Sequence, residues 1–298
     1  MRTIGRRGFL ELGLAAAGAA LGPGARPEGM SIPPGRGRFT FREWAGPALG
    51  VESHLPDRIS PDAPVIIVMH GVGRNAKSYC DAWAGAAADG AVVVAPHFPE
   101  SDFPQSRTYA QGNVRDAAGV PVSRPLWSFS AIEPLFDAVR TGLGLSTDRY
   151  VLFGHSAGAQ FVHRFVWFVP EARFRVAVAA NAGWYTRPDP STSYPYGLKG
   201  VPETDPRGGV QRNVLLLLGE ADTDPEGKNL RRSTEAEAQG PTRFDRGRTM
   251  LAAVEARAAE WGVPCGWRVE TVPGTAHSGR RMSEAAWTRL RGGILKRE

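Results

Sequence analysis

Six short runs rich in aliphatic and β-branched residues recur along the chain, and amphipathic helical patterns separate them. Nearly continuous apolar runs of this length are typical of strands buried on both faces, as in a parallel sheet covered by helices. Two segments before the first run, 38–42 and 48–55, are expected to add an antiparallel edge. The runs are 65–69, 91–95, 150–153, 175–179, 214–218 and 267–272. We therefore predict an α/β fold whose mostly parallel sheet has about eight strands and helices on both faces.

Two helices can be placed from the spacing of their apolar residues. In 131–142 the apolar positions recur at i, i+3, i+4 and i+7, so they share one face. Ser130 and Glu133 are expected to form a capping box at its start. A second apolar stripe occupies 250–261 and is followed by Gly262, which fits the position just after a helix C-terminus.

The first 25 residues have the layout of a secretory signal. A basic stretch ending in Arg6-Arg7 precedes a weakly apolar run at 9–21, which is too short to span a bilayer. The segment around the arginine pair resembles a twin-arginine export signal, although Glu11 stands where a basic residue is more usual. We expect 1–25 to be cleaved after recognition by the twin-arginine export machinery. An uncleaved anchor or a disordered tail is the alternative.

The rest of the chain is expected to form one domain. The Pro-, Gly- and Arg-rich segment 26–37 is predicted to be a linker, and 38–298 to be one α/β domain without a large lid. Export would place this domain in the periplasm or outside the cell. The oligomeric state is left open.

Composition excludes several classes of protein. The chain is 42% hydrophobic, which is too high for a disordered protein. Its two cysteines are too few for a disulfide scaffold, and we expect Cys80 and Cys265 to be buried free thiols. The net charge is +6, but the basic residues are scattered, so nucleic acid is not an expected partner. No cofactor and no metal are expected.

The motif G-x-S-x-G occupies 154–158, directly after the run 150–153 and before an apolar helix. This is the strand–turn–helix context of a nucleophile elbow, in which small residues allow a tight turn that exposes the serine hydroxyl. Ser156 is therefore the expected nucleophile, against the alternative of a structural Gly-rich turn. His155 adjoins the serine but is expected to point elsewhere on the turn, as a packing or orienting residue rather than the base.

A serine nucleophile needs a base, and the base needs an orienting acid. His277 lies in the loop after the last run and is the only histidine beyond His163, so it is the expected base. The remaining histidines have no partner pattern and are expected at surface or helix positions. They are His54, His97 and His163.

The acid is expected after the run 214–218. Asp222 lies three residues after Gly219, the glycine at the end of this run, and it is favoured over Asp224 as the acid. The same segment begins like a calcium loop, but Ser233 stands where that loop requires Glu, so calcium is not expected.

His-Gly-Val-Gly at 70–73 follows the first parallel run. The backbone N–H groups of Val72 and Ala157 are expected to form an oxyanion hole there. The alternative is a tight Gly turn without a catalytic role.

Together these motifs resemble the α/β-hydrolase superfamily over about residues 38–298. The order Ser156, Asp222, His277 is that of these enzymes. Within the superfamily the chain is similar to secreted esterases, including polyhydroxybutyrate depolymerase-like and feruloyl or acetylxylan esterase-like enzymes. The resemblance implies hydrolysis of a small or polymeric carboxylic ester through an acyl-enzyme.

Aromatic residues in the long loops 96–129 and 181–212 are expected to line the substrate site, because ligands bind beyond the carboxyl ends of parallel strands. Trp127, Trp184 and Tyr185 are the candidates, and core packing is the alternative for each. Aromatic walls suit a short acyl chain, an aromatic ring or a polyester unit. Two other functions remain open: an acyltransferase with the same triad, and a non-catalytic binding protein on this fold. A peptidase is not favoured, because no gating domain accompanies the catalytic one.

Overall fold

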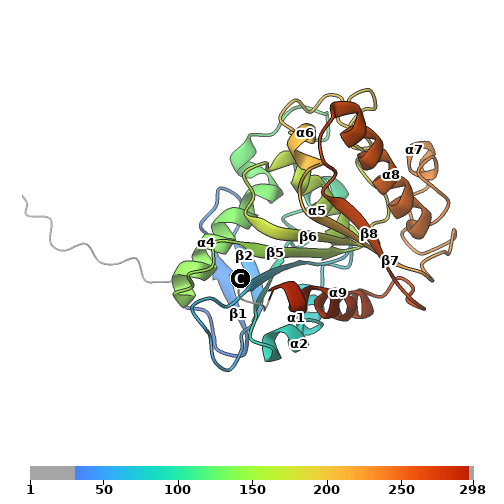
Figure 1. Ribbon diagram of the computed structural model, residues 1–298. Coiled ribbons are helices and arrows are strands. Elements are labelled where there is room, and N and C mark those ends of the chain that lie inside the picture. Colours follow the sequence, from blue (N-terminus) through green and yellow to red (C-terminus); the bar gives the residue numbers. More distant parts are fainter. Residues whose placement is uncertain (1–30, 295–298) are drawn as a thin grey trace, which may run out of the picture.

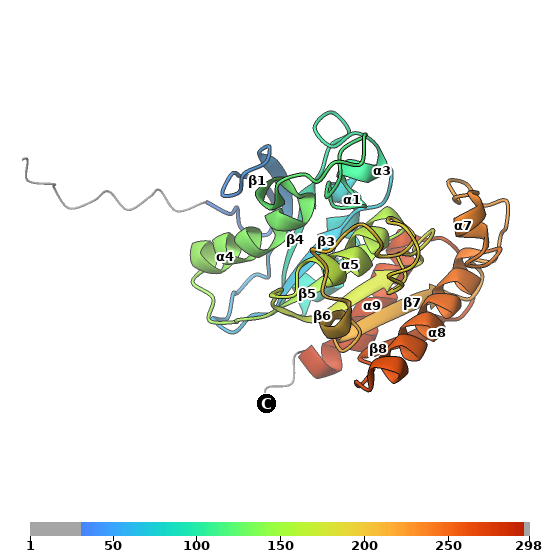
Figure 2. The same ribbon diagram turned by 90° about the horizontal axis from the view of Figure 1, so that it is seen from above.

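Eight strands form one sheet in the order β1-β2-β4-β3-β5-β6-β7-β8. The structure is a computed structural model and describes residues 31–294. The expected signal at 1–25 and the start of the expected linker lie outside the described residues. Figure 2 shows β1 and β8 at opposite ends of the sheet. The strands are β1 (Arg36–Phe41), β2 (Leu49–His54), β3 (Val65–Met69), β4 (Val92–His97), β5 (Tyr150–His155), β6 (Phe174–Ala180), β7 (Val214–Gly219) and β8 (Trp267–Val272).

Strands β3 to β8 run parallel, β2 is antiparallel to β4, and β1 is antiparallel to β2. The predicted mostly parallel sheet with an antiparallel edge is confirmed. β1 begins at Arg36, inside the segment expected to be a linker. Because Met69 at the end of β3 pairs with Gly154 on β5, the loop after β3 starts beside the G-x-S-x-G turn.

Helices cover both faces of the sheet (Figure 1). Side chains along β3 point alternately into two hydrophobic cores, one on each face of the sheet. Val65 and Ile67 pack on the face covered by α4, α5 and α8. Ile66 and Val68 pack on the face covered by α1, α2 and α9. All five residues of β3 are buried, as a strand covered on both faces requires. The six helices are α1 (Ala76–Asp81), α2 (Ala84–Ala88), α4 (Ile132–Leu143), α5 (Ala157–Phe168), α8 (Arg243–Trp261) and α9 (Gly279–Ile294).

Short helical turns occupy the connecting loops. They are α3 (Gln105–Thr108), α6 (Pro206–Gly209), α7 (Thr234–Glu237) and the 3₁₀ turns η1 (Arg124–Leu126) and η2 (Ser128–Ala131). Within residues 31–294, none of the helices combines the length and the apolar character that a bilayer span needs.

The predicted apolar face of α4 is confirmed, but the predicted capping box is wrong. Turn η2 runs directly into α4, so Ala131 is the N-cap and no side chain caps the helix. The hydroxyl of Ser130 donates to the carbonyl of Arg124 instead. Glu133 pairs with Arg173 and accepts a hydrogen bond from the hydroxyl of Tyr150.

The helix expected at 250–261 starts earlier, at Arg243, where the Thr242 side chain caps it. It ends as predicted at Gly262, which adopts the left-handed conformation with φ 63°. The two thiols are free. Cys80 is buried, and burial raises its pKa to about 12. Cys265 is exposed, contrary to expectation, because it lies in the turn between α8 and β8.

Candidate active site

Ser156 occupies a strained turn between β5 and α5, with φ 58° and ψ −115°. Non-glycine residues rarely adopt a positive φ, and such strain is often found at functional sites. The flanking glycines make the turn feasible. A Cβ at Gly154 would collide with the carbonyl of Gly158, and a Cβ at Gly158 would collide with the carbonyl of Met69.

Replacing Gly158 with Ala is expected to lower the free energy of unfolding by about 3 kcal/mol, because the backbones of α5 and β3 would have to separate. The matched control is Gly85→Ala in α2, where no atom lies within 4 Å of the added Cβ. This control is expected to leave stability unchanged or slightly higher. Urea unfolding midpoints measure both. Equal midpoints for the two variants would contradict the close approach at the elbow.

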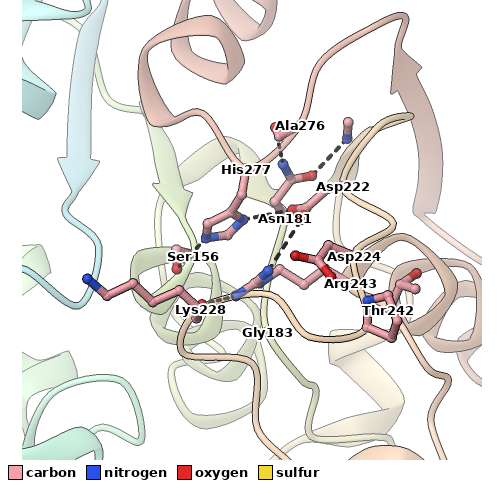
Figure 3. A network of polar contacts seen from close by, with 12 residues as sticks. Ser156, Asn181, Gly183, Asp222, Asp224, Lys228, Thr242, Arg243, Ala276 and His277 are labelled. Atoms are coloured by element: carbon pink, nitrogen blue, oxygen red, sulfur yellow. Dashed lines mark hydrogen bonds and ion pairs between the residues drawn. The ribbon is translucent and has the colours of Figure 1, made fainter.

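Three predicted site residues from three different loops come together (Figure 3). The Oγ of Ser156 lies 3.0 Å from the Nε2 of His277, and the Nδ1 of His277 lies 2.7 Å from the Oδ2 of Asp222. Asp222 is buried, whereas the His277 side chain is 28% exposed. The distances fit a serine hydroxyl donating to Nε2 while Nδ1–H donates to the carboxylate.

Asn181, which the sequence reasoning missed, connects the loops that carry the acid and the base. Its amide donates to the carbonyl of Ala276, next to His277, and its Oδ1 accepts from the N–H of Gly219 at the end of β7. Asn181 is buried and has φ 48°. Asparagine tolerates this left-handed conformation better than most residues, but no local motif marks the position.

The side chain of Asp224 has a different hydrogen-bond partner from that of Asp222. Its Oδ1 accepts the N–H of Glu226 within its own exposed loop. The geometry therefore favours Asp222 as the partner of His277. Among the described side chains, no group of three or more His, Cys, Asp or Glu is placed to hold a metal ion.

A second residue that sequence reasoning missed lies on the other side of Asp222. The Nη1 of Arg243 is 3.3 Å from the Oδ1 of Asp222, and both side chains are almost fully buried. Figure 3 shows Asp222 between His277 and Arg243. Arg243 is the first residue of α8 and lies twenty-one residues after Asp222, so the contact could not be predicted from the spacing of residues in the sequence.

Val72 and Ala157, the expected oxyanion-hole residues, line the same pocket as Ser156, which has a volume of about 210 Å³. Neither N–H donates a hydrogen bond to any partner in the described part of the chain. The preceding His70 is fully buried and holds its loop: its Nδ1–H donates to the carbonyl of Gly71, and its Nε2 accepts from the N–H of Phe98. Burial lowers the pKa of His70 to about 3, so its ring is neutral.

His155 packs beside the base His277. Its ring centroid lies 4.5 Å from that of His277, and its Nδ1 is hydrogen-bonded to the hydroxyl of Tyr79. Burial, together with the nearby His277 and Arg243, lowers the pKa of His155 well below its usual value. The ring is therefore neutral and adds no charge next to the base.

Of the three aromatic residues expected in the substrate site, only Trp184 lines the pocket. Trp127 is buried in the core, where its Nε1 donates to the carbonyl of Val122 and its ring packs edge-on against Phe168. Tyr185 is fully buried, and Gln239 binds both its N–H and its carbonyl. The predictions for Trp127 and Tyr185 are wrong because both loops fold back over α5 and bury these rings.

Cations dominate the pocket wall. Arg74, Arg231 and Arg243 line it, and Glu100, which pairs with Arg74, is the carboxylate among its described lining residues. Behind the wall, Arg164 is fully buried against Trp184, 4.1 Å from its ring centroid, and has no carboxylate partner within residues 31–294. Burial lowers the pKa of Arg164 to about 10, which leaves it charged at neutral pH. Arg231 and Arg164 are therefore the cations at this pocket that have no carboxylate partner in the described chain.

No family model matches the chain, and a search of curated proteins finds no match. Solved structures do match. Poly(aspartic acid) hydrolase-1 from Sphingomonas sp. KT-1 is 44% identical, with a TM-score of 0.84 over 86% of this chain and 98% of that one. LpqC, a poly(3-hydroxybutyrate) depolymerase from Bordetella parapertussis, is 32% identical, with a TM-score of 0.81 over 87% and 91%.

An S-formylglutathione hydrolase from Agrobacterium tumefaciens is 17% identical, with a TM-score of 0.58 over 89% of this chain and 97% of that one. This likeness concerns the fold alone. The polyaspartate hydrolase and the depolymerase, each above 30% identity, are both hydrolases and span nearly the whole described chain. Fold, motif order and these relatives together show that the chain is a hydrolase of the α/β-hydrolase superfamily, in the branch of the polyhydroxybutyrate depolymerase-like enzymes.

Proposed function

We propose that this chain cleaves carboxylic esters through a covalent acyl-enzyme formed on Ser156. The observation that carries the proposal is the continuous hydrogen-bonded contact of Ser156, His277 and Asp222, with Ser156 lining a pocket. Two backbone N–H groups without partners in the described chain, those of Val72 and Ala157, line the same pocket. This combination supplies a nucleophile, its base, an orienting acid and donors for an oxyanion.

The proposed reaction has two halves. Ser156 Oγ attacks the ester carbonyl carbon while its proton passes to His277 Nε2, and the N–H groups of Val72 and Ala157 stabilise the oxyanion. The tetrahedral intermediate then collapses, the C–O bond to the alcohol breaks, and His277 returns the proton to the leaving oxygen. In the second half, water gives a proton to His277 and attacks the acyl carbon, which releases the acid and regenerates the Ser156 hydroxyl.

Hydrolysis of p-nitrophenyl butyrate in the presence of competing alcohols tests this proposal against its alternatives. We expect butyrate to be the main product at all alcohol concentrations well below that of water. An acyltransferase would give the butyryl ester of the alcohol instead. A non-catalytic binding protein would give neither product and would not react with a fluorophosphonate.

A second candidate substrate is an amide bond in a chain that carries carboxylates. The arginine-lined pocket favours it, because carboxylates pair with guanidinium groups. The 44%-identical relative is a poly(aspartic acid) hydrolase, so an anionic polymer is a substrate type for this branch. The same acyl-enzyme chemistry would apply, with an amine in place of the alcohol as leaving group.

Replacing Arg231 with Gln is expected to raise KM for poly(aspartic acid) or a carboxylate-bearing ester about tenfold, and to change KM for p-nitrophenyl butyrate less than twofold. Arg231 lines the pocket, and its Nε donates to the hydroxyl of Tyr196 rather than to a carboxylate. The matched control is Arg232→Gln, since Arg232 pairs with Glu226 away from this pocket. Equal changes in KM for anionic and neutral substrates would contradict an anionic specificity.

We also propose that the enzyme acts outside the cytoplasm. The basis is the twin-arginine-type sequence at 1–25, with Arg6 and Arg7 before its apolar run. Such a location would give the enzyme access to polymers that do not enter the cell. Replacing both arginines with lysine should retain the protein in the cytoplasm, and unchanged export would contradict this route.

A further inference from the structure

We propose that Arg243 is a positioning residue for the triad: it fixes the carboxylate of Asp222 in the orientation that holds His277 against Ser156. This inference rests on the proposed acyl-enzyme function. It concerns a residue outside the nucleophile, base and acid, and it predicts how removing that residue changes kcat and KM.

The start of α8 holds Asp222 by two separate contacts. The Nη1 of Arg243 lies 3.3 Å from Oδ1 of Asp222, and the N–H of Phe244 donates to the main-chain carbonyl of Asp222 at 3.3 Å. The second terminal nitrogen of Arg243 donates to the carbonyl of Lys228 at 2.6 Å. Both terminal nitrogens of the guanidinium therefore link α8 to the loop that carries Asp222.

The two oxygens of Asp222 have different partners. Oδ2 faces His277, and Oδ1 faces Arg243. The side chains of Asp222 and Arg243 are only 3% and 4% exposed, so water does not readily replace either partner. Removing the guanidinium would leave a buried carboxylate with one oxygen unpaired, which is costly and allows the group to rotate away from His277.

Two other guanidinium groups lie near Arg243, but neither pairs with Asp222. Arg246 is one turn further along α8 and donates to the carbonyls of Gly183 and Gly240. Arg231 lies on the pocket wall and contacts Tyr196. Among the described residues, Arg243 is thus the cation in direct contact with the acid.

The test compares Arg243→Gln, Arg243→Lys and the control Arg248→Gln, which removes an exposed guanidinium from the same helix. The readout is kcat and KM with p-nitrophenyl butyrate at one fixed pH, because this ester is neutral and does not report the charge of the pocket. For Arg243→Gln we expect kcat to fall about 100-fold with KM changed less than threefold.

Arg243→Lys keeps a cation beside Asp222 and should recover part of the lost kcat. Arg248→Gln should match the wild type. A wild-type kcat in Arg243→Gln, or equal losses of kcat in both Arg243 variants, would overturn the proposal. If Arg243→Gln does not fold, Arg243→Lys decides alone: a lowered kcat with an unchanged KM supports the proposal, and any other result overturns it.

Labelling by a neutral fluorophosphonate separates failure of this inference from failure of the proposed function. A wild-type protein that does not react would overturn the proposed function. A wild-type protein that reacts, with an Arg243→Gln variant that reacts at the same rate from pH 5 to pH 8, would overturn only the role of Arg243.

Discussion

Replacing Ser156 with Ala is expected to lower kcat for p-nitrophenyl butyrate by about 10⁵-fold, to the residual level that oxyanion stabilisation and binding alone provide. The Oγ of Ser156 is the atom that lies 3.0 Å from His277, and its removal deletes the nucleophile. No other described side chain takes its place in the pocket with a hydroxyl bonded to His277.

The fold should survive this substitution. Ala has the same Cβ as Ser, so the strain of the turn at φ 58° is unchanged. Circular dichroism and the urea midpoint are the controls, and both should match the wild type. Retention of more than a tenth of the wild-type kcat in a folded Ser156→Ala protein would exclude Ser156 as nucleophile.

Replacing Asp222 with Asn is expected to lower kcat about 10⁴-fold, because an amide favours the wrong tautomer of the histidine and does not stabilise the imidazolium. The 2.7 Å contact with Nδ1 of His277 is the geometric basis. Asp222→Asn also leaves Arg243 without its carboxylate partner, so the urea midpoint must be measured alongside the kinetics.

Asp224→Asn is the matched control. Asp224 lies two residues after Asp222, and its side chain accepts a hydrogen bond from the N–H of Glu226 in its own loop. Its kcat should stay within threefold of the wild type. A larger loss for Asp224→Asn than for Asp222→Asn would reverse the assignment of the acid.

The parts of the fold that could be predicted are those with a local signal. β3 and β7 are continuous apolar runs, and burial on both faces dictates such a pattern. Ser156 carries a motif that a tight strand–helix turn requires. Asp222 and His277 have no motif of their own, but both follow strands whose carboxyl ends meet at one edge of the sheet.

The errors arise where long-range packing decides the outcome. Trp127 and Tyr185 lie in loops without periodicity, and only the folded chain shows that α5 buries them. Ser130 had the spacing of a capping residue, but the 3₁₀ turn before α4 leaves it no amide to cap. Asn181 and Arg243 reach the site through contacts with residues distant in sequence, which no spacing predicts.

The most direct test of the central claim is to trap the acyl group on Ser156. The protein would be mixed with p-nitrophenyl butyrate, quenched in acid within milliseconds, digested and analysed by mass spectrometry. We predict a butyryl group on the peptide that contains Ser156, and no such group in the Ser156→Ala protein. Turnover of the ester with no acyl group on that peptide, or with the acyl group on another residue, would contradict the account.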